Sequence, residues 1–559
     1  MTEVGRRRFL AGAGATAALA AVPRSARAAE DPFAHGVASF DPTSSSVILW
    51  TRVAPPAELR WEVASDEAMH EVVARGTVRA ETARDGCVRV EVDGLEPATV
   101  WWYRFTAGDR RSPVGRTRTM ADQPTERLRL GLAACSRYAA GGFAAYRAMA
   151  GRELDLVVHV GDYIYEDGGA DHRAQDPPHR CTTLTDYRTR YAQHRLDPDL
   201  QALHARHPVV AVWDDHESAG NAWRDGARDH DDATDGPWLD RLLAAGQAHD
   251  EWLPGRTGTG DDGRLRAWRT LPLGLADLVV LDTRTWGRDR QPTPDDDLNA
   301  ARDLLGDDQE QFAVAALRAK DRAPWRVVAN QVMLHPLRVP LTTGLSSQLQ
   351  ARGYEVFDHQ AINPDQWDGY PRARERFLRE GVGEDGGVLV LTGDIHSSWA
   401  WEGPAEAGGG PAMVEIVAPS VTTQAFAELL PLPAPIAEAG ISAVERDLSY
   451  VELARHGFVI VDLTADRAQA EWWYVDPATT GPATFGTARA TPRTVPMRLT
   501  DVTTPTDDPP PPAPSTTTTT PPSPVRDSGG SRSFPVVPVA AAGVAALAAG
   551  VIALRRRRS

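Results

Sequence analysis

The sequence predicts an α/β protein with two packed sheets flanked by helices, preceded by a small all-β domain. Residues 31–120 contain short, alternating β-rich runs separated by polar turns, a pattern typical of immunoglobulin- or fibronectin-like sandwiches. Residues 126–476 contain near-continuous apolar runs of strand length that alternate with helical stretches, which indicates sheets covered on both faces. The chain of 559 residues has room for both domains and for a tail at each end.

The N-terminal segment, residues 1–28, has the three parts of an export signal. Arginines at 6–8 precede an apolar run at 11–22, and Ala26 and Ala28 place small residues at the −3 and −1 positions of a cut after Ala28. The paired arginines resemble the twin-arginine type of signal. We therefore expect the twin-arginine export machinery to be a partner of this protein, and we expect export in the folded state.

The C-terminal end predicts a stalk and a membrane tether. Residues 503–533 are rich in Pro and Thr and cannot bury enough apolar surface to fold. Residues 534–554 form an apolar run long enough to span a bilayer as a helix, and the basic residues 555–559 predict a cytoplasmic tail. We expect a protein anchored at the extracellular face of the cell membrane. The alternative is a sorting tail that is removed, which would leave a secreted protein.

Charge and cysteine content narrow the classes of function. The net charge of −16 argues against nucleic acid as the main partner, because phosphate backbones recruit Lys and Arg. It does not argue against a phosphate-ester substrate, since a bound cation reverses the local field in a cleft. The three cysteines, Cys87, Cys135 and Cys181, are too few for a disulfide scaffold, and a pairing of Cys87 with Cys181 stays open.

Polar side chains that can bind metals follow five predicted strands directly. In open α/β sheets the ligand cleft lies beyond the carboxyl ends of the strands, so these side chains are expected to meet at one edge. The strands cover residues 128–133, 156–160, 209–213, 278–281 and 388–391. In chain order they are followed by Cys135 and Arg137, by Asp162 and Tyr165, by residues 214–217 and Asn221, by Arg284, and by Asp394 and His396.

The spacing within these groups strengthens the prediction. Asp394 and His396 alternate with Ile395, so in an extended segment both point to the same side. Tyr165 lies three residues after Asp162, and a tight turn would aim both side chains inward. A tyrosine ligand binds as phenolate and favours a hard, highly charged metal such as ferric iron.

Other candidates are ambiguous when taken alone. Cys135 would by itself be read as an inert buried thiol, whereas beside a metal it would bind as thiolate. Residues 214–217 carry four polar side chains directly after an apolar strand, which favours a site over a surface turn.

Five histidines outside these groups are not expected to bind metal. His159 lies inside an apolar strand and is expected in the core or behind the site. Four others fall in a polar helical region and are expected at the surface: His179, His194, His204 and His207.

Together these motifs resemble the PhoD-like alkaline phosphatases and phosphodiesterases of the calcineurin-like metallophosphoesterase group. The resemblance implies the two-sheet metallophosphoesterase sandwich as the fold of the second domain. It covers about residues 31–474, with the motifs in family order. The matching pieces are residues 33–39, 49–52, 134–136, 161–166, 213–217, 281–284 and 392–396.

The resemblance implies one ferric ion (Fe³⁺) and calcium ions (Ca²⁺) that hold phosphate. Asp162 would bridge the two kinds of metal, and Asp394 would bind calcium. A further ligand would come from the region of Asp215 and Asn221, and which of the two supplies it stays open. The implied iron ligands are Cys135, Asp162, Tyr165 and His396.

The implied function is an exported metallophosphoesterase of the alkaline phosphatase type, acting on phosphate monoesters, diesters or both. His216 would give a proton to the leaving oxygen, by analogy with related phosphoesterases, while Arg137 and Arg284 have the geometry to contact phosphate. A first alternative is a phosphodiesterase or phospholipase D acting on lipids or teichoic-type polymers. A second alternative is an inactive cell-surface binding module.

Overall fold

The computed structural model describes residues 31–506, apart from residues 170, 321–322 and 338, most of 341–362, and residues 404–409 and 431–432. The predicted signal (1–28), the predicted stalk from residue 507 on, the predicted membrane segment and the basic tail lie outside the described residues. Within the described part of the chain, none of the helices has the length and apolar content needed to cross a bilayer.

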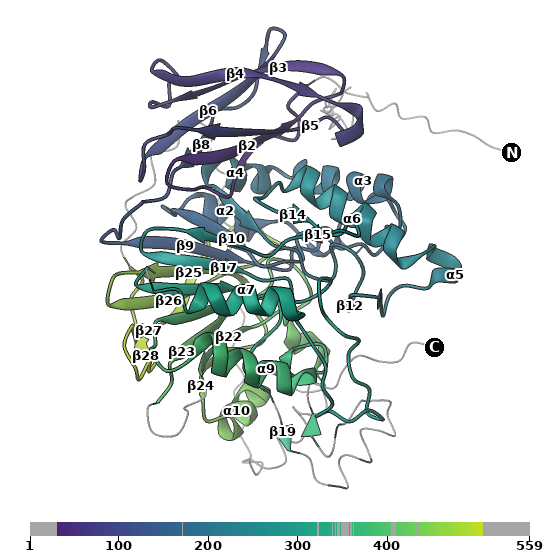
Figure 1. The fold of residues 1–559 in the computed structure, drawn as a ribbon, viewed down its shortest axis with the longest axis vertical. Helices are drawn as coiled ribbons and strands as arrows, with labels where there is room; N and C mark the ends of the chain where they lie inside the picture. The colour runs from purple at the N-terminus through teal and green to yellow at the C-terminus, as the bar shows by residue number, and fades with distance from the viewer. Residues whose placement is uncertain are drawn as a thin grey trace, which may run out of the picture.

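Two large sheets pack face to face and form the centre of the molecule (Figure 1). The larger has the order β28-β27-β26-β25-β9-β10-β11-β1-β2-β5. Its strands are β28 (Thr500–Val502), β27 (Thr484–Pro492), β26 (Arg467–Val475), β25 (His456–Leu463), β9 (Leu128–Ala133), β10 (Leu156–His159), β11 (Val209–Ala211), β1 (Val37–Phe40), β2 (Ser46–Arg52) and β5 (Cys87–Asp93).

The second large sheet has the order β16-β17-β18-β21-β23-β22-β24. Its strands are β16 (Arg269–Pro272), β17 (Ala276–Val280), β18 (Trp325–Ala329), β21 (Val388–Thr392), β23 (Met413–Val417), β22 (Ser398–Glu402) and β24 (Leu448–Glu452). Strands β9, β10 and β11 run parallel in one sheet, and β17, β18, β21 and β23 run parallel in the other. The core between the sheets includes Leu132 and Val158 from the first and Leu278 and Leu391 from the second.

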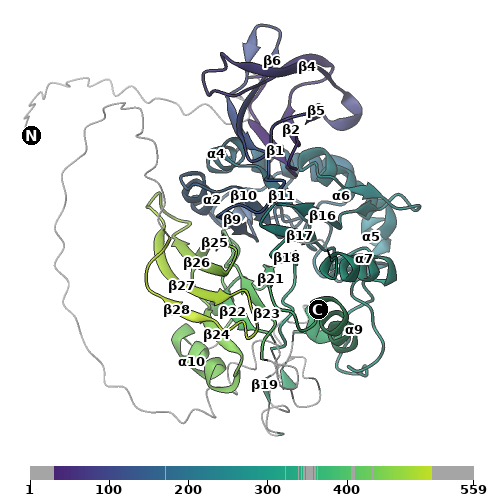
Figure 2. The same cartoon turned by 60° about the vertical axis from the view of Figure 1, so that its left-hand side comes forward.

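Helices cover the outer faces of both sheets, as Figure 2 shows from a second side. The larger sheet is covered by α2 (Ala144–Ala150), α3 (Leu184–Arg195), α4 (Pro198–Arg206) and α6 (Trp238–Trp252). The smaller is covered by α7 (Asp307–Leu317) and α9 (Pro371–Phe377), and α10 (Ala434–Val444) packs beside β22 and the edge strand β24. Because both faces of the central strands are buried, the strands are apolar along most of their length, as the sequence indicated.

Side-chain hydrogen bonds to backbone N–H groups define the first residues of helices α3 and α4. The Thr183 side chain accepts a hydrogen bond from the Asp186 backbone N–H, and the Asp186 side chain accepts one from the Thr183 N–H, which makes a capping box at the start of α3. The Asp197 side chain caps α4 by accepting the backbone N–H groups of Asp199 and Leu200, and Pro198 follows at the first helical position, where its missing N–H is not needed.

The N-terminal region is a β-sandwich that shares one of its sheets with the rest of the molecule. Strands β3 (Ala57–Ala64), β4 (Val72–Ala80), β6 (Val100–Ala107), β7 (Arg110–Arg111) and β8 (Gly115–Arg118) form one layer. The facing layer is β1, β2 and β5, and Phe40 of β1 pairs in parallel with Val209 of β11. The predicted α/β sandwich with a preceding all-β region is thus confirmed, and the two parts are joined by a continuous sheet.

The histidine predictions hold in part. His159 is buried and hydrogen-bonds to the Tyr146 hydroxyl at 2.8 Å, as expected for a core histidine. The prediction of surface positions is wrong for His194, His204 and His207, which are fully buried. Their helices look polar in sequence but are enclosed between the larger sheet and neighbouring helices.

Candidate metal centre

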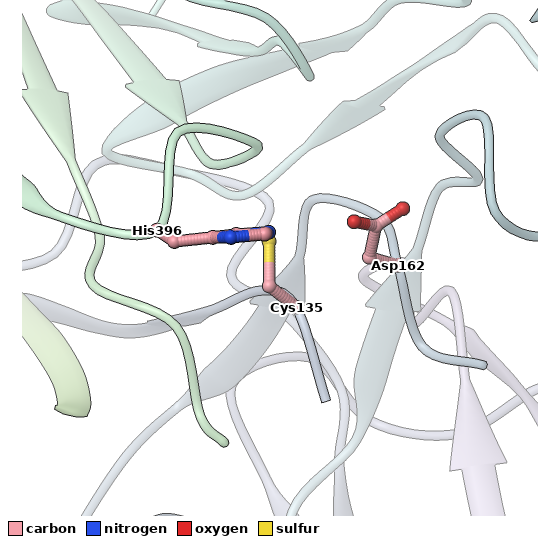
Figure 3. A group of neighbouring side chains, drawn as sticks. All are labelled: Cys135, Asp162 and His396. Carbon is pink, nitrogen blue, oxygen red and sulfur yellow. The ribbon is translucent and has the colours of Figure 1, made fainter. Parts of the chain in front are cut away.

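The loops after β9, β10 and β21 bring Cys135, Asp162 and His396 together, as Figure 3 shows. One ligand atom from each lies within 4.8 Å of the others. Because β9 and β10 belong to the larger sheet and β21 to the smaller, the group forms where the carboxyl ends of the two sheets meet. This is the edge at which the sequence placed the site.

Backbone strain is concentrated at the predicted ligands. Non-glycine residues rarely adopt positive φ, because the Cβ atom then crowds the backbone, so such positions often mark functional sites. Among the described residues, nine non-glycine residues have positive φ, and five of them are predicted ligands. These are Cys135 (60°), Asp162 (55°), Asn221 (55°), Asp394 (61°) and His396 (56°).

Tyr165 joins the first group through its hydroxyl. Its Oη donates to Asp162 Oδ2 at 2.7 Å and lies 3.2 Å from His396 Nε2. His396 Nδ1 lies 3.0 Å from the Gln424 carbonyl oxygen, which can only accept, so Nδ1 carries the proton and Nε2 offers its lone pair to the centre. Four different donor types, a thiol, a phenol, an imidazole and a carboxylate, therefore converge on one point.

The thiol and the phenol are held in their neutral forms by the protein alone. Burial, followed by the charges of Asp162 and Asp394, raises the pKa of the Cys135 thiol well above its ordinary value. Burial and Asp162 raise the pKa of Tyr165 in the same way. Deprotonation of either group therefore requires a strong positive charge nearby, which a multivalent metal ion supplies.

Two further groups of ligand-type residues adjoin the first. Asp162, Asp215 and His216 form one, so Asp162 belongs to two groups, as a bridging ligand would. Asp214, Asp215 and Asp394 form the other, with ligand atoms again within 4.8 Å of one another. Carboxylate clusters of this kind fit hard cations such as calcium.

Asp215 and Asn221 lie together at the site. The Asn221 backbone N–H donates to Asp215 Oδ2 at 2.5 Å. The Asn221 side-chain oxygen is buried and meets no hydrogen-bond donor among the described residues, so it is available to a cation. The geometry thus keeps both residues as candidate ligands.

Arg284 lies among the carboxylates and is fully buried. It donates from Nη2 to Asp394 at 2.8 Å and from Nη1 to Asp365 at 2.8 Å, and its Nε contacts Asp214. Arg288 also donates to Asp365, at 2.7 Å. Since its nitrogens face carboxylates, Arg284 fixes the acidic groups in place, and its contact with phosphate stays a prediction.

Arg137 lies at the rim of the site. Its side chain is 24% exposed and donates from Nη2 to Asp167 Oδ2 at 2.7 Å, with Asp171 3.4 Å from Nη1. A partly exposed guanidinium can exchange such partners for a ligand, so this position is compatible with phosphate contact.

His216 is held and charged by a buried carboxylate. Its Nδ1 lies 2.7 Å from Glu166 Oε2, and Glu166 also accepts the Gly220 N–H at 2.8 Å. Burial alone would lower the pKa of His216, but the nearby carboxylates of Glu166, Asp215 and Asp162 outweigh it and raise that pKa well above its usual value. His216 therefore carries a proton that it can donate.

Several residues of the centre were not singled out from the sequence. Glu166 stands inside a recognised motif, so its position next to Tyr165 was the available signal. The segments that hold the others carry no such motif. The additional residues are Glu166, Asp365, Gln366, Thr423 and Gln424.

Comparison with known proteins shows the family of this chain. The family model described as PhoD-like phosphatase matches residues 130–472, and the model of the N-terminal domain of the same family matches residues 17–121. Alkaline phosphatase D of Bacillus subtilis (strain 168) is 36% identical over 437 residues, which cover 71% of this chain and 72% of that protein.

Among solved structures, one described as the structure of PhoD superposes with a TM-score of 0.73 at 31% sequence identity. The match covers 85% of this chain and 93% of the other. The chain therefore belongs to the PhoD-like phosphatase family and is a hydrolase of phosphoric esters.

Proposed function

We propose that this phosphatase uses a mixed iron and calcium centre to hydrolyse phosphate monoesters, diesters or both. The observation that carries the proposal is the pair of adjoining ligand groups that share Asp162. Thiolate, phenolate and imidazole donors suit a ferric ion, whereas carboxylate and amide oxygens suit calcium. The iron ligands would be Cys135, Asp162, Tyr165 and His396, and the calcium ligands Asp162, Asp394 and Asp215 or Asn221.

The roles of the protein groups follow from their positions. When bound, such metal ions lower the pKa of coordinated water and offset negative charge on the phosphoryl oxygens. His216 donates a proton to the leaving oxygen, and Glu166 orients its ring and supports its charge. Arg284 bonds to both the Asp214 and the Asp394 carboxylates and so fixes their positions relative to each other.

The proposal is tested with Cys135→Ala and Tyr165→Phe. We expect both variants to lose iron and phosphoesterase activity together, because each removes a ligand of the same ion. Iron and calcium are measured by elemental analysis of protein purified from a host competent for twin-arginine export. The matched control is Cys181→Ala, which removes another buried thiol outside the centre. Wild-type activity with normal metal content in either ligand variant would refute the assignment.

The same preparations separate the possible substrates. A monoester and a diester are assayed in parallel, with and without calcium. Faster hydrolysis of the diester, followed by cleavage of a phospholipid or a teichoic-type polymer, would favour the phosphodiesterase alternative. A binding module without activity would retain neither iron nor turnover.

The proposed location is the extracellular face of the cell membrane. It is supported by the arginine-containing signal at residues 1–28 and by the apolar residues 534–554 near the C-terminus. N-terminal sequencing of the exported protein should begin at Ala29, and Arg7→Lys with Arg8→Lys should block export. Release of the full-length protein into the medium would contradict the tether.

A further inference from the structure

The segment 420–424, which follows β23, touches three of the four predicted iron ligands. The backbone N–H groups of Thr422 and Thr423 both donate to the Cys135 carbonyl, at 3.3 Å each. The Gln424 carbonyl receives the Nδ1–H of His396. The Thr423 side chain of the same segment hydrogen-bonds to the third ligand, Tyr165. No sequence motif marked this segment.

The Thr423 hydroxyl stands between two acceptors. Its Oγ1 lies 2.8 Å from Tyr165 Oη and 2.8 Å from the Cys135 carbonyl oxygen, and the residue is buried. A hydroxyl has a single proton and can serve one of them at a time. The Cys135 carbonyl already receives two backbone N–H groups, so it stays satisfied when the hydroxyl turns to Tyr165.

Metal binding decides which acceptor the hydroxyl serves. With the phenol protonated, Tyr165 donates to Asp162. As a ligand, Tyr165 is a phenolate, and it then needs donors in place of that bond. His396 Nε2 cannot donate, because the ring proton is on Nδ1, and the Asp162 carboxylate cannot donate either. An anionic oxygen is a stronger acceptor than a carbonyl, so the Thr423 proton moves to the phenolate.

We propose that Thr423 is a positioning residue that donates its hydroxyl proton to the Tyr165 phenolate and thereby sets how strongly the phenolate donates charge to a ferric ion. The inference rests on the proposed function of this centre as an iron site. A hydrogen bond stabilises the phenolate electrons, so phenolate-to-ferric charge-transfer absorption lies at higher energy than it would without the bond. The bond also holds the ligand oxygen in place.

The test uses Thr423→Val, which keeps the side-chain shape and removes the hydroxyl, and Thr423→Ser, which keeps the hydroxyl. The matched control is Thr422→Val, because the Thr422 hydroxyl donates to the Arg137 carbonyl and not to Tyr165. In iron-loaded protein we expect the absorption band of Thr423→Val to move to longer wavelength. We also expect its affinity for iron against a competing chelator to fall by about 10-fold or more. Thr423→Ser and Thr422→Val should match the wild type in both readouts.

An unshifted band together with unchanged iron affinity in Thr423→Val would overturn the proposal. If that variant does not fold, vibrational spectra of iron-loaded wild type and Thr423→Ser in H₂O and D₂O replace it. A phenolate vibration that shifts with solvent deuteration supports the hydrogen bond, and one that does not shift refutes it. Wild-type protein that binds no iron would instead refute the proposed function itself.

Discussion

At the scale of single residues, the centre combines residues at positive φ with a charged side chain, Glu166, that contacts His216. A non-glycine residue at positive φ costs about 1–3 kcal/mol, and glycine would relieve that strain while removing the ligand. Cys135, Asp162 and His396 nevertheless adopt positive φ, which is consistent with the ligand role proposed for their side chains. Glu166 adds a charge that places a proton on His216.

Glu166→Gln keeps the shape of this partner and removes its charge. The pKa of His216 should fall, so the protonated acid is lost at a lower pH and the alkaline limb of the kcat profile moves toward lower pH. We expect kcat to drop by about 10- to 100-fold with iron content unchanged. Steady-state kinetics across pH measure both effects, with Glu62→Gln in the distant N-terminal sheet as the control. A profile that stays in place would show that His216 is not the proton donor.

At the scale of elements, Glu217 joins the loops that follow β10 and β11. Its Oε2 accepts the backbone N–H groups of Asp162 at 3.1 Å and Asp214 at 2.7 Å, and its Oε1 accepts that of Tyr163. Burial raises the pKa of Glu217 to about 7. One side chain thus fixes the turn geometry of two ligand-bearing loops.

Glu217→Gln should loosen both loops at once. An amide nitrogen cannot accept, so at least one buried N–H loses its partner, at a cost of about 1–3 kcal/mol in the free energy of unfolding. Chemical denaturation measures this loss, and elemental analysis should show reduced iron in the same sample. Unchanged stability would mean that water replaces the carboxylate.

Buried histidines on and next to helices α3 and α4 contribute to the pH dependence of stability, as do His35, His159 and His249, whose pKa values burial also lowers. Burial lowers the pKa of His194 and His207 to about 3, and burial also lowers the pKa of His204 well below its ordinary value. The unfolded chain takes up these protons near pH 6.5, so the stability present above that pH is lost progressively as pH falls toward 3.

At pH 5.5 each buried histidine should remove about 1.4 kcal/mol from the free energy of unfolding. Denaturant titrations at pH 7.5 and 5.5 test this expectation. His207→Gln should reduce the difference between the two pH values, since glutamine does not titrate. An equal difference in variant and wild type would place the pH sensitivity elsewhere.

At the scale of the whole molecule, the N-terminal sandwich is built into the catalytic part. The Trp50 indole N–H donates to the Glu251 carbonyl at 2.8 Å, and its ring lies 5.7 Å from that of Trp252. Asp41 accepts from Arg269 at 2.6 and 2.9 Å in a buried ion pair. The outer edge of β11 is covered by β1.

A chain that begins at residue 126 should therefore be insoluble. It would expose the β11 edge, Trp252 and an uncompensated Arg269, and free edges and apolar patches promote aggregation. Soluble yield and size-exclusion profiles, compared with a chain that begins at residue 31, measure the outcome. A monomeric shortened chain with full thermal stability would show that the sandwich is dispensable.

The sequence by itself determined much of the fold and predicted the candidate ligands. Strands buried on both faces are apolar along most of their length, so the central strands could be recognised from the apolar runs in the sequence. Residues that follow such strands lie at a sheet edge by geometry, which is why Asp162, Asp394 and His396 could be proposed as a site. The alternation of Asp394, Ile395 and His396 is likewise a local property.

Only the tertiary structure decided which strands face each other and what supports the ligands. It divided the five strand ends between two sheets and enclosed three histidines expected at the surface. It also placed Thr423 against Cys135, 288 residues away in the chain. Contacts of this kind depend on how sheets pack. Sheet packing brings together segments that are far apart in the chain, and the local sequence pattern of one segment does not predict which other segment it will contact.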